Sequence, residues 1–157
     1  MLTADQMRSL PECFTDIPDP RRAQGRRHRL ATVLALAAGA ILCGMRGYQA
    51  ISDWAKSLSP KARERFHCRR QNGRYLVPST YILRDVLIRV DPTALDHALQ
   101  AWNAAYGQAD ESLAIDGKTM RNALDEPGHQ THILGVVGHP SQTCYPQKSR
   151  YPAGRGQ

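Results

Sequence analysis

The stretch from Leu113 to Arg121 holds residues whose types and spacing could do chemistry. A short apolar run ends in a single carboxylate, Asp116, and Gly117 follows it. Lys118 and Arg121 come within the next five positions. A strand would fix the carboxylate, glycine would let a ligand approach the backbone closely, and the cations could neutralise phosphate oxygens. This pattern suits a metal ion that meets a phosphate.

The same stretch also fits a simpler structure. Asp-Gly is a common turn signal between two strands, so Asp116 and Gly117 could form a hairpin turn. Lys118 and Arg121 would then be solvated side chains without a ligand. On spacing alone, the turn is the favoured interpretation.

A second candidate is the arm from Arg21 to Arg29. It carries five arginines in nine residues around Gly25: Arg21, Arg22, Arg26, Arg27 and Arg29. Each guanidinium brings a fork of donors to phosphate, and cations that bind DNA release its counterions. The density of arginine therefore indicates DNA contact, although a solvated loop ahead of a helix fits it equally well.

The overall charge agrees with a polyanionic partner. The chain of 157 residues has 21 Lys and Arg against 14 Asp and Glu, a net charge of +7. Such a balance favours nucleic acid or an anionic membrane surface. The longest apolar run, Leu30 to Met45, is shorter than the roughly 20 residues that span a bilayer, and the first ten residues show no secretory signal. We therefore expect a cytoplasmic protein without a membrane segment and with reduced thiols.

The elements that must position these residues are mostly helical. Apolar residues nearly all round predict a buried helix from Leu30 to about Leu42, and helical spacing predicts another from Tyr48 to Ser57. Further helices are predicted from three cap signals, Ser59-Pro60, Ser79-Thr80 and Asp91-Pro92, with the last helix ending near Tyr106. A second basic loop, His67 to Tyr75, contains Arg69, Arg70 and Arg74.

After Gly107 the residue pattern changes from helical periodicity to short runs with strand character. Leu113 to Asp116 and Thr131 to Val137 have strand character and could pair as antiparallel neighbours, joined by a connection over Thr119 to Glu126. From Pro140 onward the chain shows no apolar periodicity, which is typical of a disordered tail.

In order along the chain, these segments resemble the DDE transposases of bacterial insertion sequences, of the kind that includes the H-repeat-associated proteins. The resemblance covers roughly residues 14–139. It is carried by Ile17-Pro-Asp-Pro-Arg-Arg, Gly25-Arg-Arg-His-Arg-Leu, Ala50-Ile-Ser-Asp-Trp-Ala, Val90-Asp91, Ala114-Ile-Asp-Gly-Lys-Thr-Met-Arg and His132.

The resemblance implies a function for the stretch around Asp116. In that family a helical associated domain precedes an RNase H-like catalytic domain, in which two Asp and a Glu hold divalent metal. Asp116 would be the first of these carboxylates, a catalytic ligand of Mg²⁺, with Lys118 and Arg121 contacting DNA beside it. This implication outweighs the preference for a simple turn.

The expected fold is therefore mainly α, a helical associated domain followed by the first strands of an incomplete RNase H-like α/β domain. We expect a basic N-terminal arm (1–29), a helical transposase-associated domain (30–107), the start of the catalytic domain (108–139) and a disordered tail (140–157).

The end of the chain departs from the family pattern. Asp125 and Glu126 are the only acidic residues after Asp116, and Lys148-Ser149-Arg150 stands where the family has a Lys-Ser-Asn-Glu-like stretch. Without the second Asp and the Glu, the expectation is a truncated chain that binds Mg²⁺ weakly or not at all and is inactive alone.

Three classes of function stay open. The chain could be an inactive remnant of a transposase. It could be a small DNA-binding or regulatory protein that grips transposon ends, or that interferes with a full-length transposase or pairs with itself. It could also be a decayed product without a stable fold, since a partial sheet leaves unpaired edges.

Overall fold

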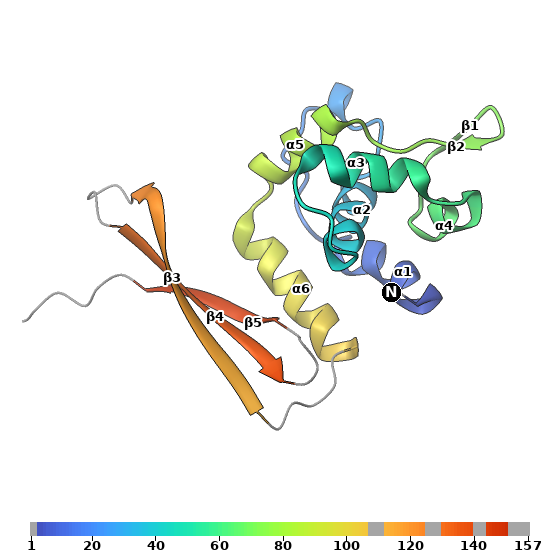
Figure 1. Ribbon diagram of the computed structural model, residues 1–157. Coiled ribbons are helices and arrows are strands. Elements are labelled where there is room, and N and C mark those ends of the chain that lie inside the picture. The colour runs from blue at the N-terminus through green and yellow to red at the C-terminus, as the bar shows by residue number, and fades with distance from the viewer. Residues whose placement is uncertain (1–2, 107–111, 125–129, 140–143, 151–157) are drawn as a thin grey trace, which may run out of the picture. The chain divides into compact units, whose positions relative to one another are not determined.

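The computed structural model describes residues 3–106, 112–124, 130–139 and 144–150, with side chains for 3–105 (Figure 1). The chain divides into two compact units, Met1–Trp102 and Asn103–Gln157. The first unit carries the helices, and the second carries a three-stranded sheet. The mainly helical character predicted from the sequence is confirmed.

The first unit contains helices α1 to α5, most of α6, one 3₁₀ turn and one short hairpin. Their bounds are α1 Ala4–Cys13, the 3₁₀ turn Ala23–Gly25, α2 Leu30–Leu42, α3 Tyr48–Ser57, α4 Pro60–Arg65, β1 Arg70–Gln71, β2 Arg74–Tyr75, α5 Thr80–Arg89 and α6 Pro92–Tyr106.

Helix α2 is the centre of this unit. It packs against α1, α3 and α5, and most of its residues are buried, as its apolar composition predicts. Gly39 lets the rings of Phe66 and Trp54 come close, because a Cβ at this position would lie 3.0 Å from the Phe66 ring and 3.1 Å from that of Trp54. The two rings meet edge to face with centroids 5.9 Å apart.

Helix α1 was not expected from the sequence. Thr3 accepts a hydrogen bond from the backbone N–H of Gln6, and the Gln6 side chain accepts one from the N–H of Thr3. This reciprocal capping box fixes the start of the helix. Leu10 on α1 and Phe14 just after it are fully buried in the core, so the helix is held by packing as well as by its cap.

The three predicted cap signals are present. Ser59 accepts from the N–H of Ala62 and Ser79 from that of Ile82, while Asp91 accepts from the N–H of Thr93. Each cap satisfies a backbone donor that has no partner inside its own helix.

The second basic loop forms a hairpin. Arg70 pairs with Tyr75 and Gln71 with Arg74. Asn72 and Gly73 have φ angles of 49° and 75°, which is the left-handed backbone that a tight two-residue hairpin turn needs. The hairpin therefore holds Arg70 and Arg74 on a defined backbone.

The second unit is an antiparallel sheet in the order β3-β4-β5, with β3 Ser112–Leu124, β4 Gln130–His139 and β5 Cys144–Arg150. Asp116 pairs with Gly135 and Gly117 with Leu134. The Asp-Gly pair therefore lies inside a strand, and the interpretation as a hairpin turn is wrong.

Two further expectations for this unit differ from the structure. Residues 119–124, predicted as part of a connection, belong to β3, whose pairing with β4 shifts register between Thr119 and Leu124. Residues 144–150, which lie within the predicted tail, form β5 because the free edge of β4 offers them backbone partners. Residues 125–129, 140–143 and 151–157 lie outside the described part of the chain.

In the part of the chain that the structure describes, no helix is both long and apolar enough to span a bilayer.

Candidate nucleic-acid interface

The arm predicted to contact DNA is built around the side chain of Arg21. This guanidinium is only 2% exposed and forms a two-pronged ion pair with Asp19. Its Nε donates to Asp19 Oδ1 at 2.9 Å and its Nη2 to Oδ2 at 2.8 Å. The Arg21 backbone N–H also donates to Oδ1, at 3.0 Å. Asp19 and Arg21, two residues apart in the sequence, are thus joined by three hydrogen bonds.

The same guanidinium also binds backbone carbonyls further along the arm. Nη1 donates to the carbonyl of Gly25 at 3.2 Å, and Nη2 donates to that of His28 at 2.8 Å. Arg26 folds back over this ion pair, with its Nε 3.0 Å from the Arg21 carbonyl oxygen and 3.6 Å from Asp19 Oδ2. Residues 19–28 therefore wrap around one buried cation.

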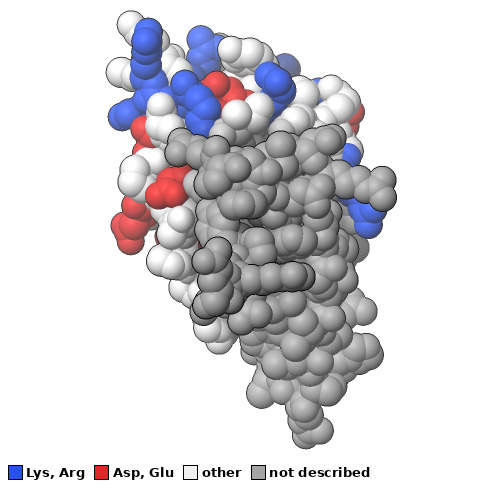
Figure 2. Space-filling view, turned by 90° about the vertical axis from the view of Figure 1, so that its left-hand side faces the viewer, with Lys and Arg blue, Asp and Glu red and all other residues white. Residues whose placement is uncertain are grey.

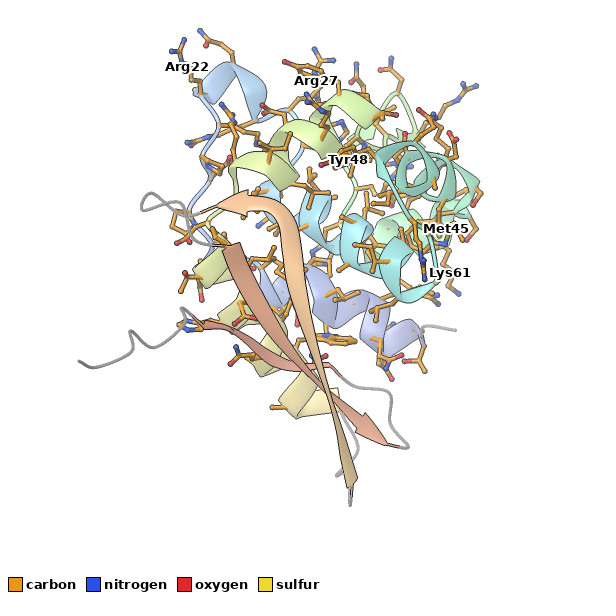
Figure 3. The ribbon with its side chains drawn as sticks, turned by 60° about the vertical axis from the view of Figure 1, so that its left-hand side comes forward. Arg22, Arg27, Met45, Tyr48 and Lys61 are labelled. Carbon is orange, nitrogen blue, oxygen red and sulfur yellow. The ribbon has the colours of Figure 1, made fainter. Side chains whose placement is uncertain are left out.

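These contacts give the five arginines of the arm different environments. The side chain of Arg21 is buried and paired within the protein, and that of Arg26 contacts Asp19 but stays exposed. Arg22, Arg27 and Arg29 are exposed, and no hydrogen bond or ion pair within residues 3–105 holds their guanidinium groups. Figure 3 shows Arg22 and Arg27 projecting from the same end of the first unit. The exposed three are the ones free to meet a phosphate.

The second basic loop lies beside the arm. The hydroxyl of Thr32, in the first turn of α2, donates to the carbonyl of His67 at 3.0 Å. Burial lowers the pKa of His28, and the charges of Arg69, Arg21 and Arg27 lower it further. Four exposed arginines lie on these two segments, Arg22, Arg27 and Arg29 on the arm and Arg69 on the loop, and we call them together the arm–loop surface.

Arg63, in the last turn of α4 ahead of the second basic loop, has an internal role. Its Nη1 donates to the carbonyl of Tyr75 at 3.1 Å, and its Nη2 donates to the carbonyl of Lys56. It ties α4 to β2 and to the end of α3. Arg70 lies over the ring of Tyr75 at 5.8 Å and stays exposed.

The charge of the chain is concentrated in the first unit and α6. Residues 1–106 hold 16 of the 21 cationic residues and 9 of the 14 acidic ones, a net charge of +7, whereas residues 107–157 hold five of each. Figure 2 shows Lys and Arg side chains gathered at the top of the visible face, with a few acidic ones among them. A field of this sign attracts a polyanion.

The sheet carries the second group of predicted site residues. Asp116, Lys118 and Arg121 all lie on β3, with Asp116 opposite Gly135 and Lys118 opposite Ile133. Asp116 is the one acidic residue on strands β3, β4 and β5.

Metal-binding and nucleophilic side chains do not form another site in the residues whose side chains are described. No group of three or more His, Cys, Asp or Glu is placed to hold a metal there. Burial raises the pKa of the Cys13 thiol to about 12 and that of Cys68 to about 11. Both thiols are free and protonated at neutral pH, which makes them poor nucleophiles.

The sequence matches the family described as DDE_Tnp_1-associated over residues 11–103. This is more than half of the chain, and the chain therefore belongs to this transposase-associated family. The match covers almost all of the helical unit, including the arm and the hairpin.

Among curated relatives, the chain is 32% identical over 126 residues to the "Uncharacterized protein in dhlA 3'region" of Xanthobacter autotrophicus, covering 77% of this chain and 41% of that protein. It is 25% identical over 123 residues to the "H repeat-associated putative transposase YbfD" of Escherichia coli K12, with 77% and 47% covered. For YhhI of the same strain and type, the identity is 24% with 77% and 31% covered. The predicted resemblance to DDE transposases of the H-repeat-associated type is confirmed.

The chain spans less than half the length of each of these relatives. No solved structure matches it significantly.

Proposed function

We propose that the helical unit is a DNA-binding module of an H-repeat-associated transposase-family protein, and that it grips the phosphate backbone of the transposon ends. The observation that carries this proposal is that two basic segments are held together, because the hydroxyl of Thr32, three residues after Arg29, donates to the carbonyl of His67, two residues before Arg69. Arg27 and Arg29 come from the arm and Arg69 from the second loop, and all three are exposed and unpaired within residues 3–105.

The chemistry of the surface favours phosphate over base edges as its main ligand. Arginine forks pair with phosphate oxygens in two-pronged geometry, and each neutralised phosphate releases counterions. A surface with four such groups should give a plot of log affinity against log salt concentration with a slope of about −3 to −4.

The test is a salt series with the purified chain and a fluorescent DNA duplex, read by anisotropy. Arg27→Ala and Arg69→Ala should each weaken binding and make the salt slope shallower by about 1, because each removes one phosphate contact. Arg8→Ala is the matched control, since Arg8 lies on α1, is paired with Asp5 and carries the same charge.

Two results would contradict the proposal. One is a wild-type chain that does not bind DNA at low salt. The other is an Arg8→Ala chain that loses as much affinity and slope as Arg27→Ala, which would mean that net charge alone drives the binding.

For the sheet, we propose that β3 corresponds to the first strand of an RNase H-like domain, with Asp116 as its first metal ligand and Lys118 and Arg121 near the DNA. The support is the family membership and the position of Asp116 inside a paired strand. Mg²⁺ in phosphoryl-transfer sites usually needs more than one carboxylate, and the described strands supply only Asp116. These strands alone do not supply the carboxylates of a two-metal site.

The corresponding prediction concerns Mg²⁺ binding. A titration of the chain with Mg²⁺, followed by NMR at the amides of β3, should show weak binding at best, and Asp116→Asn should abolish any shift. Tight binding, or shifts that persist in Asp116→Asn, would remove Asp116 from this role.

A further inference from the structure

We infer that Asp19 and Arg21 are positioning residues for DNA binding: their ion pair, in which the Arg21 guanidinium is buried, sets the shape of the arm and so aims Arg22, Arg27 and Arg29 outward. This inference rests on the proposed function. It assigns Arg21 to the support of the DNA-binding surface and leaves the phosphate contacts to its neighbours.

The geometry identifies the pair as the centre of the arm. The Arg21 guanidinium donates hydrogen bonds to the start, the middle and the end of the segment. Their acceptors are the Asp19 carboxylate, the Gly25 carbonyl and the His28 carbonyl. Few contacts made by other side chains cross this loop, and those of Arg26 return to the same two residues, Asp19 and Arg21. The conformation of the arm therefore depends on one ion pair.

The arm should depend strongly on this ion pair, because breaking the pair costs free energy. Removing one partner of a buried ion pair leaves the other charge buried without compensation, which is far more costly than losing a surface pair. Asp19 also lies between Pro18 and Pro20, whose rings restrict the backbone on both sides of it. Loss of the pair should free residues 21–28 while the core helices stay in place.

The order that the ion pair gives to the arm should affect its affinity for DNA. A loop that is ordered before it meets DNA loses less conformational entropy on binding than one that must be ordered by the DNA. The exposed arginines of the arm should therefore bind more tightly with the pair intact, even though neither Asp19 nor Arg21 touches the DNA.

The sharpest test is Asp19→Asn, because a purely electrostatic role and a positioning role of Asp19 predict opposite changes in DNA affinity. The substitution removes a negative charge, so a purely electrostatic account expects tighter binding to DNA. The positioning role expects weaker binding, by at least about threefold. Asp16→Asn is the matched control, since Asp16 is exposed, three residues away, and has no hydrogen bond or ion pair within residues 3–105.

A double-mutant cycle separates positioning from a general loss of stability. If the pair aims Arg27, then Arg27→Ala should cost less affinity in the Asp19→Asn background than in the wild type, by at least about twofold. Both variants are compared at a temperature where circular dichroism shows full helix content. Additive losses would mean that the pair does not act through Arg27 and would overturn the inference.

Hydrogen exchange tests the arm without DNA. The amides of Gly25 and Arg26 donate to the carbonyls of Arg22 and Ala23 in the 3₁₀ turn, and they should lose protection in Asp19→Asn while the amides of α3 and α5 keep theirs. If wild-type protein fails to bind DNA, the proposed function fails, and this exchange result still decides whether the pair orders the arm. Unchanged protection at Gly25 and Arg26 would refute the positioning role.

Discussion

Arg21 and Arg27 show how far the residue type alone determines a role. Both are arginines in the same nine-residue arm, yet one is buried against a carboxylate and the other projects freely. The density of arginine predicted a basic arm but could not separate these roles. The signal that could have done so is Asp19, an acid two residues before Arg21 and flanked by prolines, because a fixed acid so close to an arginine favours a local pair.

Asp19 also has a titration behaviour set by this environment. Its partial burial raises the pKa, but hydrogen bonds and charge from Arg21, with the charge of Arg26, outweigh the burial and leave the pKa of the carboxyl below its ordinary value. A lowered pKa means that the pair stabilises the fold above the ordinary pKa of Asp, about 3.9, and that this stabilisation is lost as the pH falls through the folded-state pKa. The arm should therefore stay formed throughout the physiological pH range.

His28 provides a prediction at the residue scale. Its pKa is lowered in the free protein by burial and by Arg69, Arg21 and Arg27. A bound phosphate would offset those positive charges and favour the imidazolium, so DNA should raise the pKa of His28. By linkage, DNA affinity should then increase as the pH falls through the pKa of the bound form. An NMR titration of the His28 ring with and without DNA measures both values.

Arg69→Ala is the internal check on that experiment. Removing this positive charge should raise the pKa of His28 in the absence of DNA. If DNA binds but leaves the pKa of His28 unchanged, the phosphate backbone does not pass near the junction of the arm and the loop.

At the scale of elements, the helices could be predicted closely because their signals are local. The apolar run of α2 and the serine and proline caps of α4 and α5 fix their boundaries within a few residues. Helix α1 was missed although Thr3 and Gln6 have the spacing of a capping box, because it falls in the segment 1–29 that was predicted as a basic arm.

The strands could not be predicted as well. The turn chemistry of Asp116-Gly117 and the polar composition of residues 144–150 both argue locally against a strand, yet both segments pair with β4. Pairing partners that lie far away in the sequence override local preference in a sheet. The closeness of Arg69 to the arm was likewise invisible, because it arises from the packing of α2 against the loop at His67.

At the scale of the whole molecule, the uneven distribution of charge makes salt act on folding and binding in opposite directions. The +7 net charge of residues 1–106 creates self-repulsion in the folded helical unit, which salt screens. Raising NaCl from about 0.05 to about 0.5 M should therefore increase the melting temperature of this unit while it weakens DNA binding.

Tryptophan fluorescence can follow this melting, because Trp54 and Trp102 are the only tryptophans and both lie in the first unit. The melting temperature is measured at each salt concentration and set against the anisotropy series. A melting temperature that falls with NaCl would show that favourable ion pairs outweigh the repulsion in this unit.

The contact at Gly39 has a consequence for how this surface could change over evolution. Phe66 sits against the hydrogen atom of Gly39 and ends α4 three residues before Arg69. Even a methyl group there would press on a fully buried ring and, through it, on the backbone that carries the arginine. The buried side chain of Phe66 thus restricts which substitutions the proposed DNA-binding surface tolerates. Substitutions in the interior of α2 would change the position of the arginine and leave its charge unchanged.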